Sequence, residues 1–228
     1  MGKLFEDKSL RNKSYVFRDR SEAGDLLAER LSDILFPEGI ILAIPAGGIP
    51  VALEITRKLH LPLDLMIVRK VQIPGNPEAG FGAMGPDGEV IFNEPLLRRL
   101  RLTEDDIEKQ VAQTRQIVEE RNRVFRRGRP FPDVRERTTI LVDDGLASGY
   151  TMTEAVRFLQ KRKVASTIVA VPTASEESVN RLLPLVDEIY CLNVRTLYPF
   201  AVAEAYENWY DLDDREVIAR MKSLETPK

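Results

Sequence analysis

The feature that most constrains the fold of this 228-residue sequence is a repeated alternation of short apolar runs with segments of helical spacing. Such alternation is typical of βαβ units, so we predict an α/β fold, with a mostly parallel sheet flanked by helices. Ligands of such sheets bind beyond the carboxyl ends of the strands. The predicted strands are 40–44, 63–68, 139–142, 167–171 and 188–192, and the predicted helices are 23–35, 49–59, 151–160 and 176–183.

Two segments interrupt this alternation. Residues 81–84 and 89–92 flank Gly85-Pro86-Asp87-Gly88 and predict an inserted β-hairpin. Residues 103–126 predict a long helix that is too polar to be central. The length favours a single domain over residues 1–228. We expect it to divide into a core (15–92 and 138–192), a helical insertion (93–137), and a small C-terminal hood with a tail (193–228).

Composition excludes several classes of protein. With 33 Lys and Arg against 36 Asp and Glu, the chain lacks the overall basic charge that attracts nucleic acid. The longest uncharged stretch, 39–53, is too short to span a bilayer. A single cysteine, Cys191, and a single histidine, His60, exclude an internal disulfide and a zinc site built from His and Cys. We therefore expect a cytoplasmic protein with neither a membrane nor a nucleic-acid partner.

The strongest functional signal lies at residues 140–151. An apolar strand delivers Asp143 and Asp144 to its carboxyl end, and a loop of small residues then opens directly into a helix. The free N–H groups of such a loop and helix start can bind a phosphate group. Because two carboxylates would repel that phosphate, we expect them to face a ribose diol or a Mg²⁺ ion. An ordinary strand-to-helix turn is the alternative, although it does not explain two adjacent acids.

Residues 143–151 resemble the loop that binds 5-phosphoribosyl 1-pyrophosphate (PRPP) in type I phosphoribosyltransferases. Residues 44–52 are similar to the pyrophosphate loop of that family, and Val68-Arg69-Lys70 to its Arg-Lys pair at the end of the second core strand. The resemblance covers roughly residues 21–209. It implies a Mg²⁺-dependent glycosyltransferase that moves the phosphoribosyl group of PRPP to a nitrogen acceptor, with a nucleobase as one candidate, and releases pyrophosphate.

The resemblance also implies roles for individual residues. Asp143 and Asp144 would hold the ribose hydroxyls and share Mg²⁺ with the pyrophosphate, which Arg69 and Lys70 would neutralise. The alternatives are a solvated charge pair at 69–70 and a plain tight turn at 47–48. The remaining implied contacts are the phosphate loop (Gly145, Ala147, Ser148, Gly149, Tyr150 and Thr151) and the backbone of the pyrophosphate loop (Ala46, Gly47 and Gly48).

Two positions depart from the family pattern. Ala46 stands where the subgroup usually labelled predicted phosphoribosyltransferases, which this sequence resembles, commonly has Arg, so one pyrophosphate contact is missing by this resemblance. Ala147 stands where the enzymes for 6-oxopurines place an aspartate near the base, which argues against a usual hypoxanthine or guanine enzyme.

The acceptor is expected under the C-terminal hood, at Tyr198–Tyr210. Phe200 occupies the base-stacking place of the purine enzymes and Glu207 the acidic one, although aromatic residues at this spacing fit a core or an interface equally well. Residues 72–88 correspond to the mobile loop of the family, and a plain surface hairpin would look the same. A homodimer is left open. A non-enzymatic PRPP sensor is the main alternative function, and hydrolysis of PRPP is a third.

Overall fold

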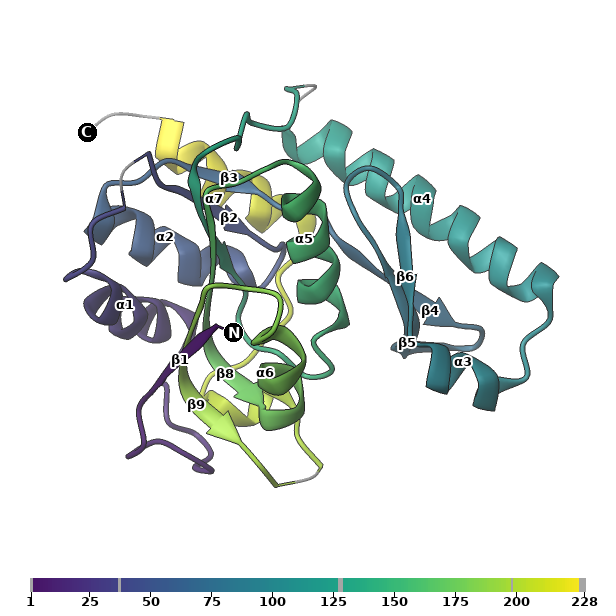
Figure 1. Cartoon of the computed structure of the whole chain (residues 1–228), viewed down its shortest axis with the longest axis horizontal. Coiled ribbons are helices and arrows are strands. Elements are labelled where there is room, and N and C mark those ends of the chain that lie inside the picture. The colour runs from purple at the N-terminus through teal and green to yellow at the C-terminus, as the bar shows by residue number, and fades with distance from the viewer. Residues whose placement is uncertain (1, 37, 127–128, 198, 226–228) are drawn as a thin grey trace.

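The centre of the protein is a six-stranded parallel sheet. The computed structural model describes residues 2–36, 38–126, 129–197 and 199–225. The strand order is β1-β9-β8-β7-β2-β3, and each neighbouring pair is parallel (Figure 1). The predicted α/β class with a mostly parallel sheet is confirmed. The strands are β1 (Lys3–Glu6), β2 (Ile40–Ala43), β3 (Leu63–Leu65), β7 (Thr138–Val142), β8 (Ser166–Ser175) and β9 (Glu188–Arg195).

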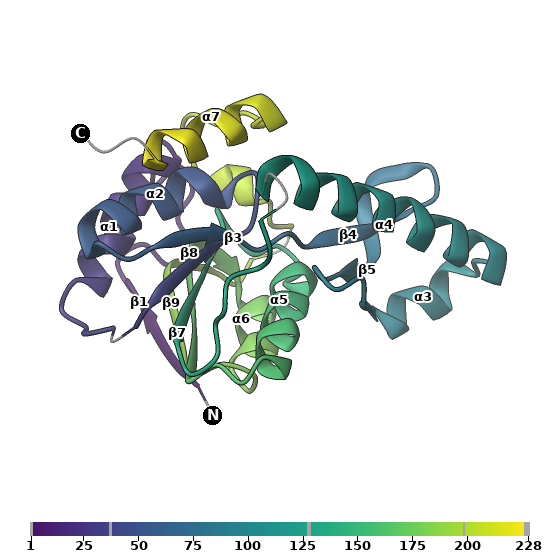
Figure 2. The same cartoon turned by 90° about the horizontal axis from the view of Figure 1, so that it is seen from above.

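Helices cover both faces of this sheet, α1 and α2 on one face and α5 and α6 on the other (Figures 1 and 2). Ile41 of β2 packs into the core formed with α1 and α2, whereas the next residue, Leu42, packs into the core formed with α5 and α6. A strand covered on both faces has no polar side, which explains the uninterrupted apolar runs in the sequence. The four helices are α1 (Arg20–Leu31), α2 (Gly48–Leu59), α5 (Tyr150–Lys161) and α6 (Glu176–Leu182).

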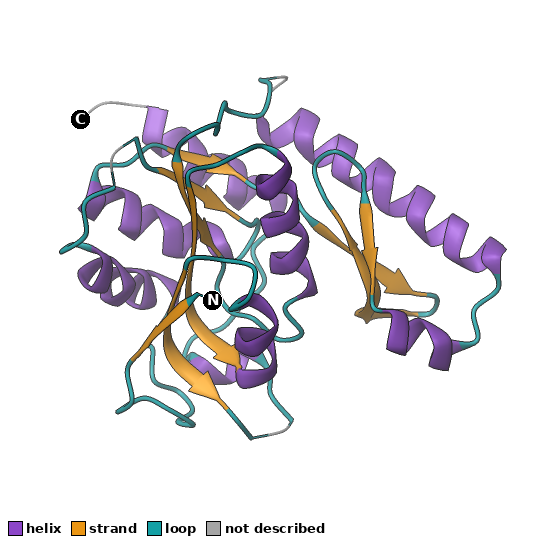
Figure 3. Ribbon diagram, in the orientation of Figure 1, coloured by secondary structure: helices purple, strands orange, loops and turns teal. Residues whose placement is uncertain are grey.

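A second, antiparallel sheet lies beside the first, next to α5, with the order β4-β5-β6 (Figure 3). It contains the predicted hairpin, β5 (Asn76–Met84) and β6 (Val90–Phe92), and adds β4 (Arg69–Ile73), which the sequence pattern did not predict. The apolar strand predicted over 63–68 is too long, because β3 ends at Leu65. Arg69 therefore begins a strand of the second sheet and does not end a strand of the first.

Two helices accompany the second sheet. The long polar helix predicted over 103–126 is confirmed as α4 (Glu104–Arg126), and a short helix, α3 (Glu94–Leu100), precedes it. Arg126 pins the end of α4 to the main sheet, since its buried guanidinium pairs with Asp64 of β3 at 2.7 Å. The pair fixes the insertion to the core at the point where the chain returns to β7.

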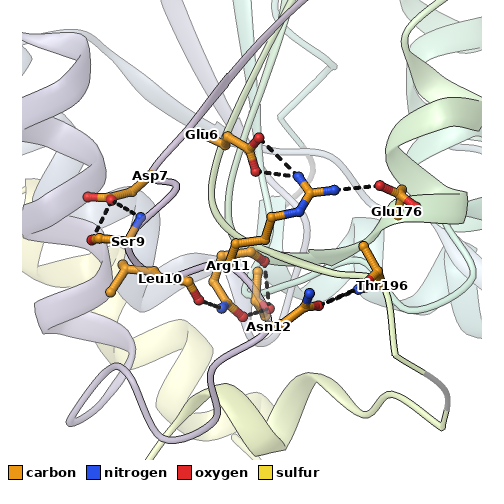
Figure 4. Close-up of polar contacts among 10 residues, drawn as sticks. Glu6, Asp7, Ser9, Leu10, Arg11, Asn12, Glu176 and Thr196 are labelled. Atoms are coloured by element: carbon orange, nitrogen blue, oxygen red, sulfur yellow. Dashed lines mark hydrogen bonds and ion pairs between the residues drawn. The ribbon is translucent and has the colours of Figure 1, made fainter.

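The N-terminal segment is tied to the carboxyl end of the main sheet. Arg11 lies between Glu6 of β1 and Glu176 of α6 and forms an ion pair with each (Figure 4). The side-chain oxygen of Asn12 accepts a hydrogen bond from the backbone N–H of Thr196, just beyond β9, at 2.7 Å. These contacts fix the chain that leads from β1 into α1.

The C-terminal segment crosses the same end of the sheet. It contains a short 3₁₀ helix, η1 (Val202–Ala205), and ends in α7 (Asp214–Glu225). Backbone hydrogen bonds join it to residues 15–18, among them Glu207 N–H to Phe17 O at 2.8 Å. Tyr198, the first residue of the predicted acceptor segment Tyr198–Tyr210, lies outside the described residues.

Within the part of the chain that the structure describes, no helix combines the length and the apolar character needed to cross a membrane.

The single cysteine of the chain, Cys191, is free and buried in β9, and burial raises the pKa of its thiol to about 12. Such a thiol is protonated and unreactive at neutral pH.

Candidate active site

The loop between β7 and α5 forms the floor of the site. Gly149 has φ +75° and caps α5, a conformation that L side chains adopt only with strain. The Ser175 and Ser178 hydroxyls both donate hydrogen bonds to the carbonyl oxygen of Ala147, at 2.7 and 2.5 Å. Because these serines lie at the start of α6, a neighbouring element holds the loop in place.

A cavity of about 410 Å³ opens over this loop. Three parts of the chain enclose it: the carboxyl end of β7 with the following loop, the second sheet with the start of α3, and η1. The first part contributes Asp143, Gly145, Leu146, Ala147, Ser148, Gly149, Tyr150, Thr151 and Met152. The others contribute Lys70, Ala79, Gly80, Gly82, Asn93, Leu96 and Val202. Thus Asp143, Lys70 and the whole predicted phosphate loop share one cavity.

The two acids after β7 face different surroundings. Asp143 lines the cavity, whereas the carboxylate of Asp144 forms an ion pair with Nε of Arg20 at 2.8 Å. The backbone N–H of Asp144 donates to Oδ1 of Asp143 at 2.9 Å, and the Tyr206 hydroxyl donates to the carbonyl oxygen of Asp144 at 2.5 Å. The acids are adjacent in sequence but not equivalent in environment.

The electrostatics of the pair follow from this arrangement. Burial, and then the neighbouring Asp144 carboxylate, raise the pKa of Asp143 well above its usual range. Burial also raises the pKa of Asp144, and the Arg20 guanidinium opposes that rise. A nearby cation favours the charged form of a carboxylate. Two buried carboxylates with raised pKa values therefore form a site where binding of a cation is favourable.

The residues present fit a Mg²⁺ ion that is shared with a ligand. Among the described residues, no three His, Cys, Asp or Glu side chains converge as a metal cage. Mg²⁺ in phosphate-transfer sites is held by one or two carboxylates together with substrate oxygens and water. Asp143 and Asp144 are the two carboxylates that could hold such an ion together with a ligand.

The predicted pyrophosphate loop packs directly against the acid pair. A Cβ atom added to Gly47 would lie 1.9 Å from Oδ2 of Asp144, and one added to Gly48 would lie 2.6 Å from the carbonyl oxygen of Val142. No side chain fits at either position, so both glycines are required for this close approach. Ala46 precedes them, half-buried, at the start of the turn, and the Pro45–Ala46 peptide bond is cis.

Arg69 and Lys70 diverge because they are neighbours in a strand. Lys70 lines the cavity, with its Cβ beside Gly80. Arg69 is not among the lining residues. Its guanidinium is close enough to Arg121 of α4 and Asp214 of α7 to interact with their charges. Burial, and then Arg121, lower the pKa of Arg69, whereas Asp214 raises it. The structure thus brings only one member of the predicted basic pair to the cavity.

The predicted acceptor residues also lie outside the cavity lining. The ring of Phe200 packs against the guanidinium of Arg195, 5.5 Å from ring centre to Cζ, and the side chain of Glu207 is exposed. Among the described residues of the hood segment, Val202 lines the cavity.

The sequence pattern did not indicate Arg20, which pairs with Asp144, or Asn93 and Leu96, which line the cavity. Arg20 reads as an ordinary residue at a helix start, and its partner Asp144 is 124 positions away. Asn93 caps α3 with its side chain, which accepts from Leu96 N–H, and a capping pattern before a short helix gives no hint of a cavity.

The comparisons with known proteins agree with this fold. The family model of the phosphoribosyl transferase domain matches residues 20–204. The chain therefore belongs to the phosphoribosyl transferase family, a glycosyltransferase class of enzymes.

Individual proteins are similar to this chain over most of its length. The protein TT1426 from Thermus thermophilus, known from a crystal structure, is 36% identical in sequence, with a TM-score of 0.72, and the match covers 91% of this chain and 98% of that one. A Mycobacterium tuberculosis protein provisionally named phosphoribosyl transferase is 35% identical over 206 residues, which are 90% of this chain and 46% of that protein. This chain thus spans about half the length of that relative. A protein of Aquifex aeolicus shares the fold, with a TM-score of 0.51 at 14% identity over 82% of this chain and 78% of that one.

Proposed function

We propose that the protein is a Mg²⁺-dependent phosphoribosyltransferase, which transfers the phosphoribosyl group of PRPP to a nitrogen acceptor and releases pyrophosphate. The observation that carries this proposal is the cavity shared by Asp143, Lys70 and the loop from Gly145 to Thr151. Three kinds of group around one space match the three parts of PRPP. The Asp143 carboxylate suits the ribose diol, the Lys70 ammonium suits the pyrophosphate, and the loop from Gly145 to Thr151 suits the phosphomonoester.

The terminal phosphate is assigned to the loop at the start of α5. Backbone N–H groups of a helix start that follows a glycine loop attract anions, and the Ser148 and Thr151 hydroxyls add two donors. Gly145, Ala147, Gly149 and Tyr150 complete the same wall of the cavity. The hydrogen bonds from α6 to Ala147 preorganise this loop, which reduces the entropy cost of binding.

The ribose is assigned to Asp143 and Asp144, whose oxygens can accept hydrogen bonds from its hydroxyls. Mg²⁺ bound there would neutralise the leaving pyrophosphate as negative charge develops on it. Lys70 supplies a further positive charge to the cavity, and the backbone at Ala46 and Gly47 supplies N–H donors beside Asp144. The N–H of Gly48 already donates to the carbonyl oxygen of Ile44 at 3.1 Å, so Gly48 contributes the close approach of the backbone. Such fixed donors stabilise a developing charge without reorganising during the reaction. Arg69 contributes at longer range, from the adjacent position in β4.

The acceptor is assigned to the hood side of the cavity, near Val202. We retain Phe200 and Glu207 as the acceptor residues of this proposal, which requires the hood to shift toward the cavity when the acceptor binds. A planar base stacked on Phe200 and hydrogen-bonded to Glu207 fits the chemistry of these side chains.

One observation favours a second candidate function, a PRPP-binding sensor without transferase activity. Phe200 stacks on Arg195, and Glu207 is exposed outside the cavity. A sensor needs the phosphate loop and the acids but no acceptor pocket.

Pyrophosphate release separates these functions. The purified protein is incubated with PRPP and Mg²⁺, alone and with adenine, guanine, xanthine, hypoxanthine, uracil or orotate. A transferase releases pyrophosphate with a particular base, and Phe200→Ala lowers that rate by about ten- to hundredfold, as expected for the loss of one stacked base. Calorimetric binding of PRPP without release supports the sensor, and release without any base supports a hydrolase. Absence of binding contradicts the whole proposal.

A further inference from the structure

Arg20 is buried at the junction of α1, the acid pair and the hood. Only 6% of its side chain is exposed. Its Nε donates to the Asp144 carboxylate at 2.8 Å, and its Nη1 donates to the carbonyl oxygen of Tyr210 at 2.8 Å. The planar guanidinium therefore bonds Asp144 through one nitrogen and the C-terminal segment through another.

An aromatic ring fixes the orientation of this guanidinium. Cζ of Arg20 lies 3.8 Å from the ring centre of Trp209, a stacking distance for a cation and an indole. Trp209 in turn lies against Tyr206, with ring centres 5.3 Å apart, and the Tyr206 hydroxyl bonds the backbone of Asp144. The rings of residues 206 and 209, which the sequence suggested as part of an acceptor hood, are thus packed around Arg20 and Asp144.

The opposite side of Asp144 is closed by the pyrophosphate loop, because there is no space for a Cβ between Gly47 and its carboxylate. Asp144 therefore has two fixed boundaries, the backbone at Gly47 and the guanidinium of Arg20. Removing Arg20 would leave a buried carboxylate without a counter-charge and free to turn away from Gly47.

We propose that Arg20 is a positioning residue, which holds Asp144 beside Gly47 and couples it to Trp209 of the hood. Arg20 itself does not touch substrate in this assignment. The effect on ligand binding rests on the proposed function, whereas the coupling between Arg20 and Asp144 does not. Because the same guanidinium contacts both the acid and the indole, a ligand that engages the acids must alter the surroundings of Trp209.

Trp209 is the single tryptophan of the chain, so its fluorescence reports on Arg20. Tryptophan emission and calorimetric heat are recorded while Mg²⁺-PRPP is titrated into the wild type, Arg20→Gln, Arg20→Lys and a control, Arg30→Gln. Arg30 is an exposed arginine at the other end of α1, paired with Asp7. We expect a saturable emission change in the wild type and in Arg30→Gln. In Arg20→Gln we expect a dissociation constant raised about tenfold or more and a lost emission change. Arg20→Lys should recover part of the affinity, because lysine keeps the positive charge but lacks the planar guanidinium that donates to both Asp144 and Tyr210.

A second measurement is independent of any ligand. Melting temperatures are compared for the wild type, Arg20→Gln, Asp144→Asn and the double variant. If Arg20 acts through Asp144, Arg20→Gln lowers the melting temperature clearly in the wild-type background and much less in combination with Asp144→Asn. Equal losses in both backgrounds, or wild-type affinity for Mg²⁺-PRPP in Arg20→Gln, would overturn the proposal. Should the wild type fail to bind Mg²⁺-PRPP, the proposed function fails, and the melting temperatures still decide whether Arg20 positions Asp144.

Discussion

At the scale of single residues, the site depends on small differences between neighbours. Asp143 and Asp144 are adjacent, yet one lines the cavity and the other is paired with Arg20. Lys70 reaches the cavity and Arg69 does not, since successive side chains of a strand point to opposite faces. These differences decide which substitutions should affect ligand binding and which should affect stability.

Asp143→Asn should separate binding from stability. The amide keeps the shape but loses the charge, so affinity for Mg²⁺-PRPP should fall at least tenfold, which is about 1.4 kcal/mol. The melting temperature should rise, because burial disfavours the charged form of Asp143 and the variant removes that charge. Calorimetry and thermal melts check both parts, with Arg123→Ala, a largely exposed residue of α4, as the control. Equal affinities in the two variants would mean that the site is elsewhere.

Gly47→Ala should disturb the acid pair by contact alone. The added methyl would meet the Asp144 carboxylate at 1.9 Å, so either the loop or the acid must move. We expect at least a tenfold loss of Mg²⁺-PRPP affinity. The matched control is Gly75→Ala in the turn between β4 and β5. No described residue lies within 4 Å of the added Cβ there, and the positive φ costs about 1–2 kcal/mol. Binding by Gly47→Ala that matches the control would contradict the close packing of this loop on the acids.

At the scale of elements, the parallel core could be predicted and the additions to it could not. Doubly covered strands such as β2 and β7 consist of apolar residues, which is a strong signal. β1 and β4 are short and half-exposed, and charged residues interrupt them, so periodicity does not detect them. The phosphate-binding role of residues 145–151 stays a prediction, but the loop itself could be located from the sequence because its pattern is local. Arg20 could not, because its role depends on a contact between distant segments.

The junction of α5 with the hairpin turn predicts a pH dependence. Glu154 of α5 is 1% exposed and faces Gly85, and its Oε2 finds no hydrogen-bond partner among the residues that the structure describes. Burial, and then Asp87, raise the pKa of Glu154 to about 7, while Lys161 and Arg157 oppose the rise. The unfolded chain releases this proton near pH 4.5 and the folded chain near pH 7. This group therefore lowers stability as the pH rises from about 4.5 to 7 and adds no further change above that.

Glu154→Gln should remove this dependence. Urea unfolding at pH 5.5 and pH 8 should show a variant that is more stable than the wild type at pH 8, by on the order of 1–2 kcal/mol, and closer to it at pH 5.5. Glu177→Gln, on the exposed surface of α6, is the control and should follow the wild type at both values. A constant difference between Glu154→Gln and the wild type would show that the carboxyl group does not titrate in this range.

At the scale of the whole molecule, the cavity lies where three separately built parts meet. The main sheet supplies Asp143 and the phosphate loop, the second sheet supplies Lys70, and the C-terminal segment supplies Val202. A ligand that fills this cavity contacts all three parts, so its binding should stabilise the folded chain as a unit. The stabilisation should require Mg²⁺, because the buried acids otherwise repel a polyanion.

The most direct test is a thermal melt with PRPP, with and without Mg²⁺. At a free concentration of about a hundred times the dissociation constant, PRPP with Mg²⁺ should add about 2.7 kcal/mol to the free energy of unfolding. We expect a raised melting temperature with both and little change with PRPP alone. In Asp143→Asn the gain with both should be at most about half that of the wild type, since a tenfold weaker affinity leaves about 1.4 kcal/mol at the same concentration. An unchanged wild-type melting temperature with millimolar PRPP and Mg²⁺ would contradict PRPP binding at this cavity.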